Sequence, residues 1–314
     1  MLAVLEITLP IYLLIGIGFV LTRRGVFSEA EIRALSRFIL SLSLPALMFS
    51  AVTAQSLSET VKLPYIAIYG IGGLAMIAGL YPVFRRVGGY DHVTTTLALM
   101  GSVCPNSGYV GYPILLLAMP EVAGRALAQN VLVELLLIIP LLLAMLEVGE
   151  GDSASPWRAA RRIGRRVVTN PLVLAILAGL TVSGLGLRLP SVLERPIDML
   201  AAASGAISLV VIGGMLAQTR PRGVRALAGY IVLAKLVLHP LVMLAGIALF
   251  ALAGLSDLPP DMRTALIVTA AVPTMGIFPV LAHAHGRAGF ASAAQFGATV
   301  ASLFTLSALL LLLR

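Results

Sequence analysis

Long apolar runs follow one another along the whole chain, separated by short stretches of charged or turn-forming residues. A helix needs roughly 20 apolar residues to cross the hydrocarbon core of a bilayer, and these runs reach that length. Hydrophobic residues make up 59% of the chain and charged residues 11%, whereas a soluble domain carries about 25% charged residues. The pattern therefore predicts an all-α polytopic protein of the membrane.

Ten spans are predicted when the apolar runs are read between their charged or turn-rich breaks. One hydrophilic connection, residues 149–170, is longer than the others and carries five arginines around Trp157. It divides the chain into a first five-helix repeat, 1–148, and a second one, 171–314. The spans are 2–22, 29–54, 63–84, 92–118, 122–147, 171–188, 196–218, 224–254, 261–284 and 289–313.

The basic residues are distributed unevenly over the two sides that these spans define. Fifteen arginines lie in or beside the connections after the odd-numbered spans, and six Lys or Arg residues lie on the opposite side. Cytoplasmic loops carry the excess of Lys and Arg, so both termini are predicted outside the cell's inner (plasma) membrane. The same placement makes the net charge of +8 a topology signal, and no nucleic-acid partner is predicted.

An odd number of spans in each half means that the second half enters the membrane from the opposite side. Two similar halves in opposite orientation form an inverted repeat, which is a common plan of secondary transporters. An offset of 168 residues carries Pro105 and Gly108 onto Pro273 and Gly276, and it carries the first span onto the sixth. The sequence therefore predicts two inverted five-helix repeats.

Helix-breaking residues interrupt the fourth and ninth spans near their middle. Cys104–Pro113 contains two prolines, two glycines and an asparagine, and Val272–Gly276 repeats the P-x-x-G pattern. A break at membrane depth persists only where protein or a water-filled cavity satisfies the backbone groups that it frees. We therefore expect spans four and nine to be broken and to cross near mid-membrane.

Such a crossing is a candidate binding site for an anion. Each second half-helix would begin near Ser107 or Met275, with free N–H groups and the positive end of its dipole toward the crossing. Asn106 and Thr274 are the polar side chains there. The alternative is a pair of ordinary proline kinks in which Asn106 satisfies a freed carbonyl. The predicted substrate-binding residues are Pro105, Asn106, Ser107, Gly108, Pro273, Thr274, Met275 and Gly276.

Three ionisable residues lie within predicted spans, where charges are costly and are functional candidates by default. Glu134 has apolar neighbours in span five, and Lys235 and His239 lie four apart on one face of span eight. Glu134 is a candidate proton carrier, and Lys235 could balance an anionic substrate or pair with Glu134. Alternatively, Lys235 snorkels to an interface, and His239 bonds a carbonyl freed by Pro240.

The sequence offers little that would hold a cofactor or a metal. A single cysteine, Cys104, excludes an internal disulfide and a cysteine cage, and we interpret it as a small apolar residue at a helix crossing. His283 and His285 lack an evident third ligand. No H-E-x-x-H motif, paired membrane aspartates or serine–histidine pair is found, so an enzyme is not predicted.

With these residues located, the chain resembles the auxin efflux carrier family, which includes plant PIN proteins and bacterial malonate or malate carriers. The resemblance rests on Asn106–Pro113, which is similar to an N-x-G-[aromatic]-x-G-x-P pattern, and on Asn170–Pro171, Lys235–Pro240 and Pro273–Thr274. It implies ten helices in two inverted repeats with helices four and nine crossing at the substrate. It also implies a scaffold of helices 1, 2, 6 and 7 beside a moving transport domain of helices 3–5 and 8–10.

The resemblance further implies that Asn106 contacts a substrate carboxylate in an elevator-like cycle. Plant members carry a second asparagine where this chain has Thr274, and their long cytoplasmic insertion is reduced here to 149–170. Both departures favour a small bacterial-type carboxylate over auxin.

We therefore expect a secondary active transporter of a small organic anion, coupled to protons. The alternatives are a sodium-coupled symporter like the bile-acid carriers, an intramembrane enzyme and a passive channel. The expected partners are the anion, a proton or Na⁺ and the lipid bilayer, with a homodimer as a further option. No cofactor is expected.

Overall fold

The computed structural model describes residues 2–54, 61–149, 161, 164–165, 167–187, 189–218, 225–255 and 258–313. Most of the predicted 149–170 linker, with Arg158, Arg162 and Arg166, lies outside these residues, as do Arg220 and Arg222. The described residues are helical, and no β-strand occurs among them.

The α-helices and π-helices (η) run in the following order. They are α1 (Leu2–Arg23), α2 (Glu29–Phe38), η1 (Ile39–Ser43), α3 (Leu44–Thr53), α5 (Leu63–Pro82), η2 (Val83–Val87), α6 (His92–Val103), η3 (Ser107–Gly111), α7 (Tyr112–Ala118), α8 (Pro120–Val133), η4 (Glu134–Ile138), α9 (Ile139–Gly149), α11 (Pro171–Gly184), α12 (Ser191–Gln218), α13 (Arg225–Leu233), η5 (Ala234–Leu238), α14 (His239–Leu252), α15 (Pro260–Ala271), α16 (Phe278–Ala284) and α17 (Ala288–Leu312).

Six helical segments among the described residues are long and apolar enough to cross a membrane. They confirm a polytopic membrane protein. The predicted spans four and nine are not among the six, because each is divided into shorter helices: α6 ends at Val103 and α15 ends at Ala271. The six segments are Glu29–Thr53, Leu63–Val87, Pro120–Glu147, Ser191–Gln218, Ala226–Leu252 and Ala288–Leu312.

Four of the π-helical segments begin six residues before a proline. They are η1, η3, η4 and η5, and the prolines are Pro45, Pro113, Pro140 and Pro240. A proline ring clashes with the carbonyl four residues earlier and removes an N–H, and a wider turn relieves that clash. In three of the segments the residue before the proline donates instead to the carbonyl five residues back. Glu134 and Lys235 both lie in such wide turns.

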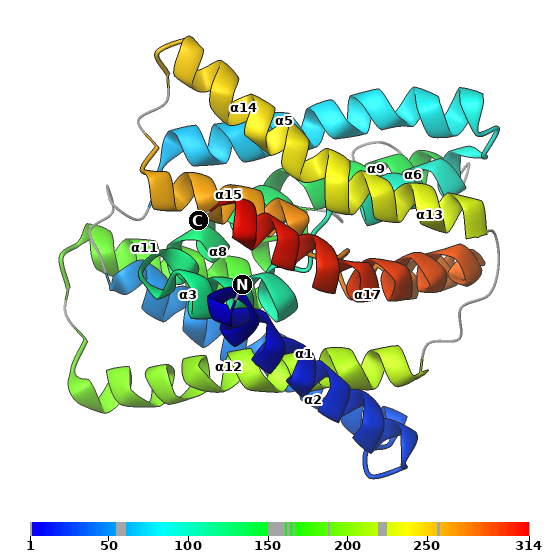
Figure 1. Cartoon of the computed structure of the whole chain (residues 1–314). Helices are drawn as coiled ribbons and strands as arrows, with labels where there is room; N and C mark the ends of the chain where they lie inside the picture. The colour runs from blue at the N-terminus through cyan, green and yellow to red at the C-terminus, as the bar shows by residue number, and fades with distance from the viewer. Residues whose placement is uncertain are drawn as a thin grey trace. The chain divides into compact units, whose positions relative to one another are not determined.

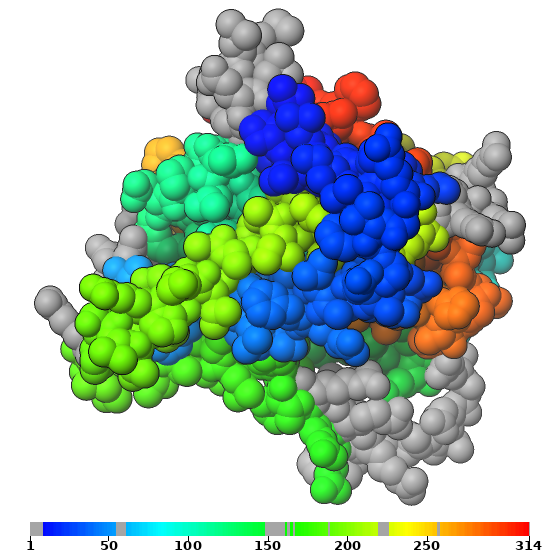
Figure 2. All heavy atoms as spheres, turned by 90° about the horizontal axis from the view of Figure 1, so that it is seen from below, coloured from blue at the N-terminus to red at the C-terminus, as the bar shows by residue number. Residues whose placement is uncertain are grey.

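The chain divides into two compact units. The first unit comprises Met1–Leu63, Ser107–Val131 and Thr169–Thr219. Within it α1 crosses α12 so closely that a Cβ on Gly213 would lie 1.9 Å from the carbonyl oxygen of Ile15 (Figure 1). Figure 2 shows the blue segment of α1 to α3 packed beside the yellow-green α12. Glycines therefore allow direct backbone contact between these two helices.

A tyrosine fixes the start of α7 inside this first unit. The hydroxyl of Tyr109 lies 2.9 Å from Ser36 Oγ on α2. Ser208 Oγ on α12 donates to the Tyr109 carbonyl at 3.2 Å. The segment that follows Asn106 is therefore held to α2 and α12 by hydrogen bonds.

The second unit comprises Pro64–Asn106, Leu132–Val168 and Arg220–Arg314. In it α6 packs against α9, α13 against α17, and α14 against α15. The buried ring of Phe278, at the start of α16, packs on α6 at Gly101, where a Cβ would lie 2.8 Å from the ring. This unit holds both proline breaks and the three intramembrane ionisable residues.

Candidate functional site

The two proline breaks lie directly against each other in the second unit. After α6 the chain is extended at Cys104, and after α15 it is extended at Val272. The Asn106 N–H donates to the Pro273 carbonyl at 2.8 Å, and the Met275 N–H donates to the Cys104 carbonyl at 3.0 Å. Pro105 and Thr274 thus form an antiparallel bridge. Each break satisfies part of the backbone that the other exposes, which is what membrane depth requires.

Two polar side chains at this crossing have buried atoms without a partner. Asn106 and Thr274 are buried, and neither Asn106 Nδ2 nor Thr274 Oγ1 has a hydrogen-bond partner among the described residues. A buried polar group without a hydrogen bond costs about 1–3 kcal/mol, so such groups are rare and call for an explanation. A ligand with acceptor oxygens would supply the missing bonds.

The sequence interpretation expected second half-helices to begin near Ser107 and Met275 with free N–H groups; η3 begins at Ser107, but the expectation of a free N–H at Met275 was wrong. The Met275 N–H is already used in the bridge, and α16 begins only at Phe278. Pairing between the two breaks uses this donor because the extended segments run antiparallel. At this second break the Thr274 side chain, whose Oγ1 has no partner among the described residues, is therefore the group left for a ligand.

The remaining predicted substrate residues lie close to Pro105 or Thr274 in the sequence. Met275 and Gly276 are half-buried in the turn that leads to α16. Ser107 and Gly108 belong to the first unit, where a Cβ on Gly108 would lie 3.0 Å from the Leu44 side chain.

The three intramembrane ionisable residues lie in the second unit with the crossing. Lys235 Nζ lies 2.9 Å from His239 Nδ1 and donates to the Ala270 carbonyl at 2.5 Å. Lys235 is fully buried, so it does not snorkel within this fold. Ala270 precedes Pro273 by three residues, and three residues span at most about 11 Å. The ammonium group is therefore held close to the crossing.

His239 does not bond a carbonyl freed by Pro240 in any contact that the structure gives. Its Nδ1 pairs with the Lys235 ammonium, which can only donate, so the proton of a neutral ring is on Nε2. That Nε2 atom is buried without a hydrogen-bond partner among the described residues. His239 therefore joins Asn106, Thr274, Gln295 and Thr305 among the described residues of this unit that have a buried polar atom without a hydrogen-bond partner.

Glu134 lies buried at the start of η4, and Tyr69 on α5 donates to its Oε1 at 2.8 Å. Glu134 also interacts electrostatically with Lys235. The sequence interpretation missed Tyr69, since one hydroxyl in an apolar run is a weak signal. Only its two contacts, with Glu134 and with the ring of His239, single it out.

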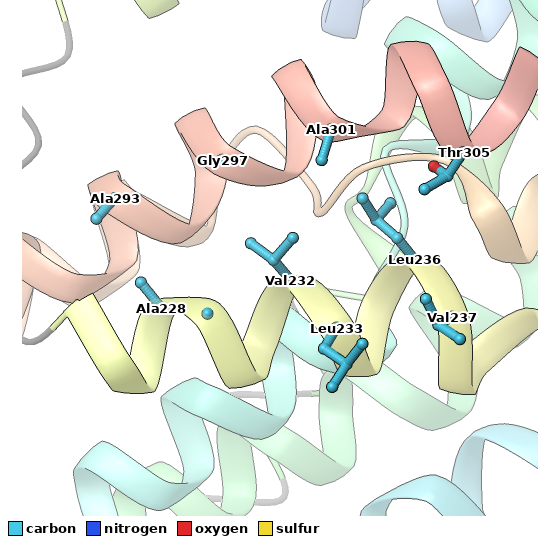
Figure 3. A pocket seen from close by; sticks show the side chains of 10 residues that line it. Ala228, Val232, Leu233, Leu236, Val237, Ala293, Gly297, Ala301 and Thr305 are labelled. Carbon is cyan, nitrogen blue, oxygen red and sulfur yellow. The ribbon is translucent and has the colours of Figure 1, made fainter.

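A groove of about 460 Å³ lies between α13–η5 and α17, and it is not a candidate for an anion (Figure 3). Figure 3 shows aliphatic side chains such as Val232 and Leu236 on one wall and the small residues Gly297 and Ala301 on the other. Its lining includes the hydroxyl of Thr305 but no charged group. Burying an anion there would leave its charge unpaired.

No cluster of three or more His, Cys, Asp or Glu side chains that could hold a metal ion occurs within the described ranges. His285 Nδ1 instead lies 2.8 Å from the Leu281 carbonyl oxygen, in the last turn of α16. The side chains gathered in the second unit are donors and one carboxylate, a set suited to binding a small anion and a proton.

Comparison with known proteins identifies the family of the chain. A family model described as "Membrane transport protein" matches residues 3–310. The chain belongs to this family. The match covers almost the whole chain and confirms the resemblance to the auxin efflux carriers.

Three relatives extend the comparison. A Rhizobium meliloti (strain 1021) protein named "Putative malonate transporter" is 31% identical over 98% of this chain and 95% of its own length. "Uncharacterized transporter YfdV" of Escherichia coli (strain K12) is 23% identical over 75% of this chain and 76% of its own. An "Uncharacterized transporter" of Methanothermobacter thermautotrophicus is 26% identical over 55% of each chain. The protein is thus a membrane transporter with a small-molecule substrate, and not an enzyme.

Proposed function

We propose that this protein is a secondary active transporter of a small organic anion, a mono- or dicarboxylate, coupled to protons. The observation that carries the proposal is the pair of unpartnered polar atoms at the crossing, Asn106 Nδ2 and Thr274 Oγ1. A carboxylate supplies acceptor oxygens to both. The name of the Rhizobium relative makes malonate the first substrate to test.

In this proposal Asn106 and Thr274 bind a carboxylate, and the backbone of Pro105, Pro273 and Met275 holds them in place. Gly276 allows the chain to pass close to the substrate. Lys235, which donates to the Ala270 carbonyl three residues before Pro273, balances the negative charge of the anion. Glu134 carries the proton, and His239 orients Lys235.

We also propose two inverted five-helix repeats, 1–148 and 171–314, joined by the 149–170 linker, with both termini outside. The 168-residue offset and the excess of arginine on one side support this plan. The elevator-like cycle follows from the family resemblance. The compact unit with spans one, two, six and seven also includes 107–131, which that resemblance assigned to the moving domain.

The test is uptake by the purified protein in proteoliposomes. The panel comprises malonate, other small mono- and dicarboxylates and a cation of similar size, each with an imposed pH or sodium gradient. We expect carboxylate uptake that a proton gradient drives and a sodium gradient does not. Drive by sodium alone would favour the symporter alternative, and transport indifferent to both gradients would contradict secondary active coupling.

Asn106→Ala tests the site itself. Because Asn106 Nδ2 has no partner within the described fold, we expect unchanged thermal stability and a KM for malonate raised at least about tenfold, the value of one bond to a charged group. Asn170→Ala is the control. That side chain caps α11 by accepting the Leu172 N–H at 2.9 Å, so its loss lowers stability by about 1 kcal/mol and leaves KM unchanged. Full transport by Asn106→Ala would remove Asn106 from the site.

A further inference from the structure

Tyr69 connects two ionisable residues that the sequence placed on different spans. It is buried in α5, and its hydroxyl donates to Glu134 Oε1 at 2.8 Å. Its ring stacks on the imidazole of His239, with centroids 6.2 Å apart and planes inclined by 21°. One side chain therefore contacts the proposed proton carrier through its hydroxyl and the partner of Lys235 through its ring.

The contacts continue from His239 to the crossing. His239 Nδ1 pairs with Lys235 Nζ, and Lys235 Nζ donates to the Ala270 carbonyl in the last turn of α15. Three residues further on, the Pro273 carbonyl accepts the Asn106 N–H. Hydrogen bonds, one ring contact and three residues of chain thus connect Glu134 to Asn106.

The surroundings of Tyr69 limit which groups can respond to a proton on Glu134. Tyr65 on α5 and Cys104 at the end of α6 interact electrostatically with Tyr69. Lys235 on η5 interacts electrostatically with Glu134 and Cys104, and it lies beside His239 of α14. Lys235 is the member of this set that carries a positive charge, because the His239 ring that accepts from its ammonium is neutral. It is therefore the group on which a loss of negative charge at Glu134 acts most strongly.

We propose that Tyr69 is a positioning residue that holds the Glu134 carboxylate for proton coupling and links it, through His239, to Lys235. The inference rests on the proposed function. A proton arriving from water binds a Glu134 carboxylate oxygen, and the bond from Tyr69 changes from charge-assisted to neutral, which weakens it. Lys235 then loses an attracting charge while it still donates to Ala270 beside the crossing. Protonation of Glu134 in this way changes the electrostatic environment of the proposed substrate-binding residues.

Tyr69→Phe tests the inference, because it removes the hydroxyl and keeps the ring on His239. A donor to the carboxylate favours its ionised form, so its loss favours the protonated form. We expect the pH of half-maximal malonate uptake to rise by about one unit, the equivalent of one such bond. The KM for malonate should change less than about twofold, because Tyr69 does not touch the crossing. A merely structural role would lower the amount of folded protein without moving the pH profile.

Tyr81→Phe is the matched control. Tyr81 lies on the same helix, and its hydroxyl is 3.0 Å from His92 Nδ1, so this variant loses a comparable bond away from Glu134. It should keep the wild-type pH profile. Glu134→Gln should flatten the profile, and Tyr69→Phe added to Glu134→Gln should change nothing further, as expected for a residue that acts through Glu134.

The outcomes distinguish a failure of the proposed function from a failure of the role of Tyr69. Wild-type protein that transports no carboxylate, or transports without regard to pH, overturns the proposed function and the role of Tyr69 with it. Proton-coupled wild-type transport together with an unshifted profile in folded Tyr69→Phe overturns the role of Tyr69 alone. Should Tyr69→Phe fail to fold, Glu134→Asp withdraws the carboxylate from the same hydroxyl and must give the same upward shift.

Discussion

Two helix crossings in this protein bring backbones into contact by opposite means. In the first unit α1 and α12 meet at Gly18 and Gly213, and both helices continue through the contact with their own hydrogen bonds intact. In the second unit α6 and α15 both end at the contact, and their extended continuations bond to each other. At the glycine crossing both helices continue, whereas at the proline crossing both end and the backbone that follows pairs with the other segment.

The difference between the crossings separates a structural contact from a binding site. Close approach through glycine favours dispersion contacts between intact helices. Breaking two helices instead leaves groups that the partner satisfies only in part, and Asn106 Nδ2 and Thr274 Oγ1 have no hydrogen-bond partner in the described part of the chain. A membrane protein tolerates such groups where a ligand can complete them. The comparison therefore predicts that variants at the first crossing affect stability and variants at the second affect transport.

Gly213→Ala should have the largest effect on stability. Its Cβ would lie 1.9 Å from the Ile15 carbonyl oxygen, so α1 and α12 must move apart at a cost of roughly 3 kcal/mol. We expect the melting temperature in detergent to fall by roughly 10 °C. Gly205→Ala, on the same helix with nothing within 4 Å of its Cβ, is the control and should melt no lower than wild type. Equal melting temperatures for the two variants would contradict a structural role for the close contact at Gly213.

Thr274→Val should show the reverse pattern at the second crossing. The Thr274 hydroxyl has no partner among the described residues, so replacing it with a methyl group leaves stability unchanged or raises it by about 1 kcal/mol. The KM for the transported carboxylate should rise about tenfold, as for one charge-assisted bond. Thr269→Val, on helix α15 just before the break, loses a hydrogen bond to the Ala265 carbonyl and should lower stability without affecting KM. A stability loss at Thr274 with unchanged KM would make it a structural residue.

Asp91→Asn should have the smallest effect. It tests whether the proline crossing depends on the ion pair between Asp91 and Arg287. Asp91 caps α6, and Arg287 reaches its Oδ2 at 3.4 Å on a half-exposed surface. Burial raises the pKa of Asp91, but hydrogen bonds from Thr94 and the Arg287 guanidinium outweigh it and hold this pKa below its ordinary value. Since asparagine also caps helices, the variant removes the charge pair at a cost below about 1 kcal/mol.

The pH dependence of that small effect follows from the lowered pKa. The carboxylate contributes stability that is fully present above its ordinary value of about 4 and is lost as the pH falls below it. Wild type should therefore melt slightly higher than Asp91→Asn at pH 7 and at the same temperature near pH 2. Melting curves at both pH values, with malonate uptake at pH 7, check this. A large loss of uptake would mean that the crossing depends on the Asp91–Arg287 pair.

The sequence predicts where the two helices break, but not which backbone groups pair at the breaks. Pro105 and Pro273 act on their own helices, so their effect is local and can be predicted. The partner of each freed backbone group is set by a chain segment 168 residues away. For this reason the expectation of a free Met275 N–H was wrong, although the helix did end near the predicted place. The π-helical turns before Pro140 and Pro240 were missed, since apolar periodicity cannot distinguish one wide turn.

For the ionisable residues, too, the sequence predicts their position and the tertiary structure decides their partners. Their position inside apolar spans was enough to mark Glu134, Lys235 and His239 as candidates, because charge at membrane depth is costly for any fold. The four-residue spacing correctly predicted that Lys235 and His239 share a face. Nothing in the sequence connected Tyr69 to Glu134, which is 65 residues away and on another helix.

The sequence by itself determined that this chain crosses a membrane, where its helices break and which buried groups are ionisable. Each of these follows from the solvent, from the geometry of proline or from the cost of a charge, and all act over a few residues. Only the tertiary structure decided which donor meets which acceptor. It paired the two breaks, left Asn106 Nδ2 and Thr274 Oγ1 unpaired and placed Tyr69 between Glu134 and His239. Hydrogen bonds require atoms within about 3 Å, and helix packing alone brings distant segments to that distance.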